Sequence, residues 1–295
     1  MNNIDSICEK YCPYKITKKG KCTIIYSMEG NFVIKENSNI KDIYKYLDSR
    51  QFYNHPKHID DLRNDINISE YIEDYDYPKE QKLNDMIDLV IDMHNKTKYV
   101  KEVTEDNYKE IYENIKNNIE YYEYKYNNLI KEIEKERFMS PSKYLFIRNS
   151  SKVLNALKYS KETINNWYLK VKEKHETTVS LIHNNLRIDH YIKKDNGYLI
   201  SFDNAKIDSP ILDIYRLYKV EFENNNINNS IRKYMDNTNM EELDRNLLFS
   251  MLTVLDGIKF NDNEFNNTIN INKRITYLYK VEELIRSYNI KDEVE

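Results

Sequence analysis

The chain has 295 residues, 40% hydrophobic and 32% charged, which suits a soluble globular protein with one large core or two smaller ones. Its 45 Lys and Arg residues are outnumbered by 49 Asp and Glu residues. A net charge of −4 without a basic block excludes the electrostatic surface that nucleic-acid binding needs. The N-terminus lacks the basic and apolar regions of a signal peptide, and no apolar run approaches the roughly 20 residues of a membrane span. We therefore expect a protein that is made in a reducing cytoplasm and stays there or in an assembly built from it.

Three cysteines, Cys8, Cys12 and Cys22, give an odd number and no disulfide framework. Cys8 and Cys12 are four residues apart, so one helix face would present both as half of a metal site, with His55 and His58 as the remaining ligands. Nothing in the sequence links the two pairs. Buried or unreacted thiols are the preferred interpretation.

The first 75 residues predict a small lobe of mixed structure. A short helix is expected around Ile4 to Tyr11. The β-branched run Cys22 to Met28 and the run Phe32 to Lys35 flank a turn with Gly and predict a β-hairpin. A helix that begins at about Ser38 follows, and the weak alternation of Ile66 to Glu73 predicts an edge strand.

Helical patterns dominate after an acidic connector from Glu73 to Pro78. The first contains Leu83 to His94, and we expect His94 to be partly buried near the helix end. Thr104 caps a very long pattern that reaches about Arg137, and a second run spans Leu145 to Val171 after a Ser-Pro break. The two runs predict an antiparallel helical hairpin, packed together by a stripe of tyrosines. Three or four further helices complete an α+β chain.

One stretch, Ser180 to Tyr215, concentrates strands, loops and polar residues. Its short elements would bring several polar side chains to one place. In chain order they are an apolar strand, a polar loop with His183 and Asn185, a strand pair turned at Asn196-Gly197, a polar knot at Ser201 to Asp203, and a helix after Pro210.

The order of these parts resembles the aminoglycoside/choline kinase-like phosphotransferases, which share the protein-kinase fold, and within them the CotS-type spore coat kinase-like proteins. The likeness extends over almost the whole chain. It implies a two-lobed fold with a small N-lobe at 1–75 and a large helical C-lobe at 76–295, which carries the long helical hairpin and a degenerate catalytic segment at 180–215. The segments that carry it are FVIK ending in Lys35, IDMH ending at His94, FMSPSKYLFIRNSS from Phe138 to Ser151, and then HNNLRIDH, GYLISFDNAK and SPILDIY.

In such enzymes an Asp of a His-x-Asp loop orients the attacking hydroxyl or accepts its proton, while an Asn five residues later and an Asp of an Asp-Phe-x knot hold magnesium. The resemblance aligns His183 with the histidine, but it places Asn185, His190 and Ser201 at the three reacting positions. An amide takes no proton at neutral pH, and imidazole suits borderline metals better than magnesium. A serine hydroxyl lacks the charge of a carboxylate. The chemical set is therefore expected to be degenerate.

Some matching residues remain. Asp203 aligns with the second acidic residue of the knot and is the weak metal candidate, with Asp189 as the other residual acidic group. Lys35 aligns with the phosphate-contacting lysine and is the weak cofactor-binding candidate, although an exposed strand-end lysine explains it equally well. The usual glycine-rich phosphate loop is missing, because Gly20 stands alone in its segment.

The resemblance gives His183 and Asp213 a structural role. The histidine would brace the catalytic loop, and the aspartate, in the first turn of the helix after Pro210, would bind the loop backbone.

Two functions remain open on these residues. The first is a pseudokinase with a structural or binding role in spore coat assembly, whose partners would be other coat proteins and which would be deposited in the coat. The second is an active ATP-dependent phosphotransferase on a small-molecule hydroxyl, which would use Lys35, Asp189 and Asp203. ATP and magnesium are expected as cofactors only in the second case.

Overall fold

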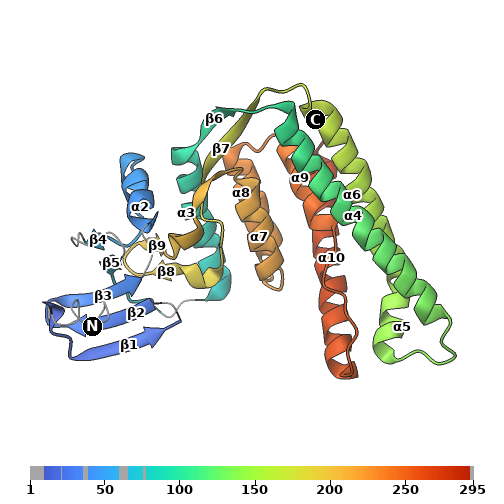
Figure 1. Cartoon of the computed structure of the whole chain (residues 1–295), viewed down its shortest axis with the longest axis horizontal. Coiled ribbons are helices and arrows are strands. Elements are labelled where there is room, and N and C mark those ends of the chain that lie inside the picture. Colours follow the sequence, from blue (N-terminus) through green and yellow to red (C-terminus); the bar gives the residue numbers. More distant parts are fainter. Residues whose placement is uncertain (1–9, 21, 36–38, 60–65, 76–77, 293–295) are drawn as a thin grey trace. The chain divides into compact units, whose positions relative to one another are not determined.

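The computed structural model describes residues 10–20, 22–35, 39–59, 66–75 and 78–292. They form two compact units, one of residues 1–99 and 179–217 and the other of residues 100–178 and 218–295 (Figure 1). The helix expected around Ile4 to Tyr11 lies for the most part outside the described residues, as do Cys8, Ser38 and two residues of the acidic connector. The lobe boundary expected after residue 75 stays a prediction.

The first unit contains a five-stranded antiparallel sheet in the order β1-β2-β3-β5-β4. The predicted hairpin is confirmed as β2 (Cys22–Ser27) and β3 (Gly30–Lys35), which pair Thr23 with Ile34. The apolar side chains on one face form a core of Tyr11, Ile25, Ile34, Ile66 and Ile68. The hairpin forms because both strands are rich in β-branched residues, of which Thr23, Ile24, Ile25 and Ile34 are buried.

The sheet has two strands beyond those predicted from the sequence. β5 (Asn67–Glu70) was expected at the edge, but it lies between β3 and the two-residue β4 (His58–Ile59), which is too short to give an alternating pattern. The other edge is β1 (Lys15–Lys19), whose five residues are all exposed and include three lysines. Lysines on an edge strand discourage pairing with another chain.

Two helices pack in the first unit. α2 (Asn39–Ser49) buries Ile40, Tyr44 and Leu47 along one face. α3 (Lys79–Thr97) follows the predicted pattern and buries its apolar residues together with His94. The short hairpin of β8 (Tyr191–Lys193) and β9 (Gly197–Leu199) packs on α3. Gly197 is required there, since an added Cβ would lie 2.6 Å from the buried Tyr191 hydroxyl.

The central stretch enters the first unit through β7 (Glu176–Ile182), which pairs antiparallel with β10 (Lys206–Asp208). Two single 3₁₀ turns, η1 (Ile188–His190) and η2 (Phe202–Asn204), lie in the loops between the strands. α7 (Ile211–Glu221) begins directly after Pro210, as the sequence predicts.

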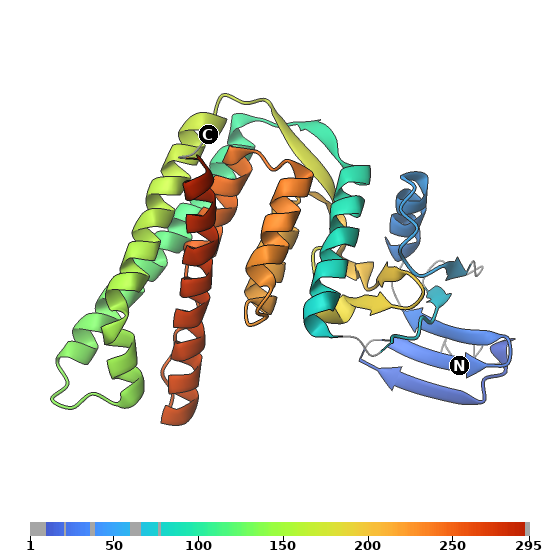
Figure 2. The ribbon, with the colours of Figure 1, turned by 180° about the vertical axis from the view of Figure 1, so that it is seen from behind.

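The second unit is built from helices after a short strand, β6 (Tyr99–Glu102). The predicted helical hairpin is confirmed by α4 (Glu105–Glu134) and α6 (Ser150–Val171), which run side by side in both Figure 1 and Figure 2. Thr104 and Asn107 form a capping box at the start of α4, which at 1.5 Å per residue is about 45 Å long. The run after the Ser-Pro break is divided at Asn149, which ends α5 (Pro141–Arg148).

The predicted tyrosine stripe packs between helices of this unit. The rings of Tyr108 and Trp167 meet edge to face at 5.9 Å, and Tyr112 stacks on Tyr168 at 4.5 Å. Buried Tyr126 donates a hydrogen bond to the Leu255 carbonyl. The remaining helices are α8 (Ile227–Thr238), α9 (Glu242–Thr253) and α10 (Glu264–Asp292). Within the described ranges, no helix combines the length and the apolar character that crossing a membrane requires.

Candidate functional site

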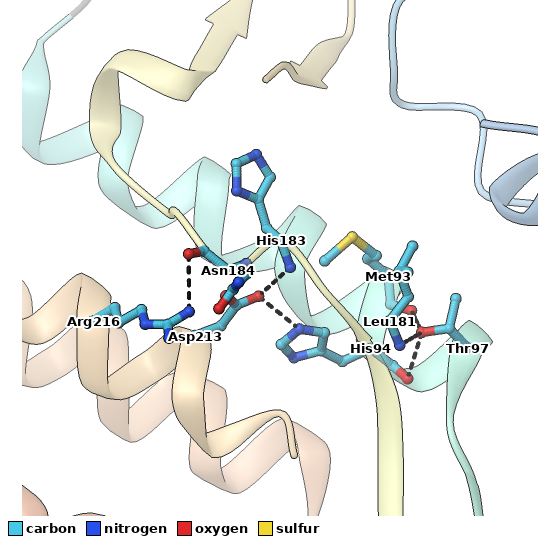
Figure 3. A network of polar contacts seen from close by, with 8 residues as sticks. All are labelled: Met93, His94, Thr97, Leu181, His183, Asn184, Asp213 and Arg216. Carbon is cyan, nitrogen blue, oxygen red and sulfur yellow. Dashed lines mark hydrogen bonds and ion pairs between the residues drawn. The ribbon is translucent and has the colours of Figure 1, made fainter. Parts of the chain in front are cut away.

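The site begins where β7 ends against α3. The backbone N–H of Leu181 donates to the Thr97 hydroxyl at 3.1 Å, and that hydroxyl donates to the Met93 carbonyl at 2.7 Å (Figure 3). Thr97 is fully buried and closes the last turn of α3. The strand end is therefore fixed on the helix, and the loop that starts at His183 leaves from a defined point.

Asp213 ties this loop to the first turn of α7. Its Oδ2 accepts the backbone N–H of His183 at 2.7 Å, and its Oδ1 accepts that of Asn184 at 2.6 Å. The Nε2 of His94 lies 3.3 Å from the same Oδ2 (Figure 3). The carboxylate is completely buried, so these three donors supply the hydrogen bonds that a buried charge requires.

The sequence alone did not indicate two members of this network. His94 was expected to be partly buried, but it is almost fully buried and contacts Asp213. Arg216 was not expected at all, and its Nη1 donates to the Asn184 carbonyl at 2.9 Å. The one available signal was its position three residues after Asp213, on the same helix face.

Hydrogen bonds from both the side chain and the backbone N–H of His183 fix this residue in place. Its Nε2 lies 2.7 Å from the Ile200 carbonyl oxygen. Because a carbonyl only accepts, Nε2 is the donor, and Nδ1 is the unprotonated nitrogen of the neutral ring. The ring lies 4.8 Å from that of Phe202. Burial lowers the pKa of His183, against the opposing effect of Asp213. A neutral, buried imidazole thus connects the loop to the strand before the knot.

The knot turns at Ser201, which has the left-handed backbone angles φ 68° and ψ 46°. Such angles are unfavourable for most residues other than Gly, Asn and Asp. The next residue, Phe202, is buried and meets the ring of Tyr44 edge to face at 5.9 Å. This contact attaches the knot to α2 and turns Asp203 away from the core, where it is about one-third exposed.

Lys35 reaches the knot from the end of β3. Its Nζ lies 2.8 Å from Asp203 Oδ2 and 3.4 Å from the Ser201 hydroxyl. The ion pair is made with Asp203, whereas Asp48, in the helix that follows Lys35, contacts His55. The lysine side chain is only 15% exposed, which differs from the exposed strand-end lysine that was the alternative.

The other two altered positions lie along the loop. The Asn185 carbonyl accepts a hydrogen bond from His190 Nδ1 at 2.7 Å, so His190 has its lone pair on Nε2 when neutral. Burial lowers the pKa of His190, opposed by this hydrogen bond, and the charges of Arg187 and Lys35 lower it further. Asp189 is exposed on η1. The structure therefore places Lys35 in direct contact with Ser201 and Asp203, and His190 is near enough for the charge of Lys35 to lower its pKa.

The donor set fits magnesium poorly. Magnesium prefers hard oxygen ligands, usually carboxylates, in near-octahedral geometry. Here the positions that the resemblance singles out, Ser201, His190 and Asn185, carry a hydroxyl, an imidazole and an amide, and the carboxylate of Asp203 already pairs with Lys35. In the part of the chain that the structure describes, no three His, Cys, Asp or Glu side chains gather as a metal site. The alternative metal site would have needed Cys8, which lies outside the described residues.

Comparison by sequence finds no relative, since neither a protein-family model nor a curated protein matches the chain. Comparison by structure finds several. An aminoglycoside phosphotransferase from Alicyclobacillus acidocaldarius superposes with a TM-score of 0.69 at 9% identity, covering 96% of this chain and 95% of the other. A spectinomycin phosphotransferase bound to AMP gives 0.53 at 11% identity, with coverages of 94% and 96%.

A choline kinase from Streptococcus pneumoniae also matches, at 15% identity and a TM-score of 0.48, with 93% and 99% of the two chains covered. The first two likenesses extend over nearly the whole of each chain, although the identities are low. The likeness concerns the fold alone. The chain thus has the α+β fold of the kinase-like phosphotransferases, with a small sheet-containing part and a larger helical part.

Proposed function

We propose that this protein is a pseudokinase, a kinase-like protein without phosphoryl transfer that has a structural or binding role in the assembly of a spore coat. The support for the absence of transfer lies in the contrast within the central loop. The contacts that shape the loop are complete, from Asp213 to the backbone of His183 and Asn184. The positions that would react hold Asn185, His190 and Ser201.

The observation that carries the proposal is the ion pair between Lys35 and Asp203. A working site needs the lysine to contact phosphates and a carboxylate at the position of Ser201 to contact magnesium, with Asp203 as the second acidic group. In this protein Lys35 and Asp203 contact each other at 2.8 Å instead. Ser201 lies beside them with a neutral oxygen. A magnesium–nucleotide complex would have to separate the pair while it gained only one carboxylate ligand.

The size of the expected catalytic loss follows from the same positions. The loss of a positioned general base typically lowers the rate by about 10²–10⁴. Ser201 and His190 replace both metal-binding positions as well, and the metal ions neutralise the charge of the transferred phosphoryl group. The individual losses do not simply add, but each acts on the same transition state.

The coat assignment rests on the resemblance of the segment Phe138 to Ser151. This segment contains α5 and is fixed in the helical unit by Glu264, which accepts from the backbone N–H of Ser142 at 2.6 Å and from its hydroxyl at 2.9 Å. Phe138 and Tyr144 remain exposed on it. Exposed aromatic side chains beside a fixed helix are suited to contacts with other coat proteins.

A second function, an active phosphotransferase on a small-molecule hydroxyl, is favoured by one observation. Lys35 and Asp203, which it requires, do converge although they are 168 residues apart in the chain. The two functions differ in ATP turnover. The pseudokinase has none with magnesium present, whereas an active enzyme loses its turnover in a Lys35→Ala variant.

A restoring variant tests the proposal directly. Asn185→Asp, His190→Asn and Ser201→Asp together supply two carboxylates and an amide near Lys35. We expect this variant to gain magnesium affinity, measured by calorimetry in the presence of ADP, but no useful ATP hydrolysis, because the phosphate loop is still missing. Full activity from the three substitutions would show that the nucleotide pocket was intact. No gain in metal binding would show that the three positions do not converge.

A further inference from the structure

A separate cavity of about 360 Å³ lies between α2 and the extended segment that follows it. From α2 it is lined at helical spacing, i, i+3, i+4 and i+7, so a single face of the helix contributes. From the segment it is lined mainly by alternate residues. The lining residues are Lys41, Tyr44, Lys45, Asp48, Tyr53, His55, Lys57 and His58. None of the residues of the kinase-like site is among them.

The lining is strongly basic in a chain that is acidic as a whole. Among the described residues it contains three lysines and one carboxylate, while the chain has a net charge of −4. Lys45 and Lys57 are exposed, and their ammonium groups make no ion pair with any residue in the described ranges. The single carboxylate, Asp48, lies 3.1 Å from Nε2 of His55. A local excess of positive charge in a hollow attracts anions.

The back of the cavity is rigid. His55 is buried and stacks on Tyr44 with the rings 4.6 Å apart and nearly parallel. Its two nitrogens both face oxygens, Nε2 toward Asp48 and Nδ1 toward the Pro56 carbonyl at 3.1 Å. Tyr44 in turn contacts Phe202 of the knot. The wall is therefore held by contacts within the protein, which favours binding because little order has to be created.

We propose that this cavity is a binding site for a small phosphate-bearing anion. Its volume is at the lower end of the range for small-molecule pockets, which suits one or two phosphate groups rather than a large ligand. Lysine binds phosphate as a mobile point charge, and Lys45 from α2 and Lys57 from the extended segment both line the hollow. A phosphate between them would be contacted from both the helix and the extended segment.

The test uses inorganic pyrophosphate without magnesium, titrated into the full chain by calorimetry at low salt. The double variant Lys45→Ala/Lys57→Ala is expected to bind at least tenfold more weakly, since it removes two charges at the ligand. The matched control Lys18→Ala/Lys19→Ala removes two exposed lysines from β1, outside the cavity, and is expected to retain the wild-type affinity. Asp48→Asn is expected to bind severalfold more tightly, because it removes the one opposing charge.

Two results with the wild-type chain and the cavity and control variants, and a third with Lys35→Ala, would overturn the site. One is the absence of pyrophosphate binding by the wild-type chain. The other is equal weakening in the cavity and control variants, which would show non-specific attraction. A Lys35→Ala variant separates this site from the kinase-like one and is expected to bind pyrophosphate as the wild type does. If Lys35→Ala alone abolishes binding, the anion occupies the kinase-like site and the cavity proposal fails, whatever the outcome for ATP turnover.

Discussion

The loop at His183 has two sides that differ in burial and in completeness. On one side, Asp213, His94 and the backbone of His183 and Asn184 form a buried network in which the carboxylate has three donors. On the other side, Asn185, His190 and Ser201, at the positions where the resemblance leads us to expect a base and metal ligands, lie partly exposed. The comparison teaches that the loop's shape and its chemistry depend on different residues. The hydrogen bonds to Asp213 involve none of these three residues.

Removing the buried carboxylate is the strongest test of the difference between the two sides of the loop. Asp213→Ala leaves two backbone N–H groups and His94 without their acceptor in a buried setting, and we expect a loss of about 3 kcal/mol or more in the free energy of unfolding. The matched variant Asn185→Ala is expected to lose less than about 0.5 kcal/mol, because its side chain is only half-buried. Urea denaturation measures both. Equal losses would contradict the division between the two sides.

Lowering the pH tests the same difference between the two sides through His183 and His190. Burial lowers the pKa of His183 and His190 in the folded protein, so the unfolded chain binds protons near pH 6.5 that the folded chain does not. The two histidines therefore do not lower the free energy of unfolding above about pH 6.5. Below that pH the free energy of unfolding falls as the pH decreases, by at most about 1.4 kcal/mol per pH unit for each histidine. His190 is only partly buried and contributes less.

The variant His190→Asn separates the two contributions. Its unfolding free energy is expected to fall less steeply between about pH 6.5 and 5 than that of the wild type, because only His183 remains. An unchanged slope in His190→Asn would show that His190 titrates alike in the folded and unfolded chains.

The smallest expected effect concerns backbone strain. Ser201 and Asn184 both have left-handed angles, with φ of 68° and 64°. Asn tolerates this conformation better than Ser, so Ser201→Asn is expected to stabilise the protein by about 0.5–1 kcal/mol. The reciprocal variant Asn184→Ser is expected to destabilise it by a similar amount or more, since it also removes the hydrogen bond from Asn184 to the Asn204 carbonyl. Thermal denaturation of the two variants measures both the expected stabilisation and the expected destabilisation.

Sequence patterns predicted the elements that have strong local signals. The β2–β3 hairpin, the long α4, and α7 after Pro210 follow from β-branched runs, helical periodicity and a proline. β1 was not predicted because KITKK is entirely exposed and lacks a buried face. The two-residue β4 gave no pattern, so the neighbouring strand was placed at the edge.

The site was predictable only in part, because its contacts join residues distant in the chain. The resemblance placed Asp213 near the loop, and the structure gives the two hydrogen bonds by which it contacts the loop backbone. Lys35 was expected to contact phosphate or to be exposed, whereas it pairs with Asp203, which is 168 residues away. No local pattern indicates such a pair. Arg216 donates to a backbone carbonyl. Every residue has such a carbonyl, so no sequence pattern identifies the acceptor.

The central claim is that the Lys35–Asp203 pair and the altered loop leave no site for magnesium and ATP. Thermal melting of the wild-type chain with ATP and magnesium, with and without a chelator, tests it most directly. A ligand present at a hundred times its dissociation constant would add about 2.7 kcal/mol and raise the melting temperature by several degrees. We predict no magnesium-dependent shift. A rise of several degrees that disappears when the metal is chelated would contradict the pseudokinase proposal.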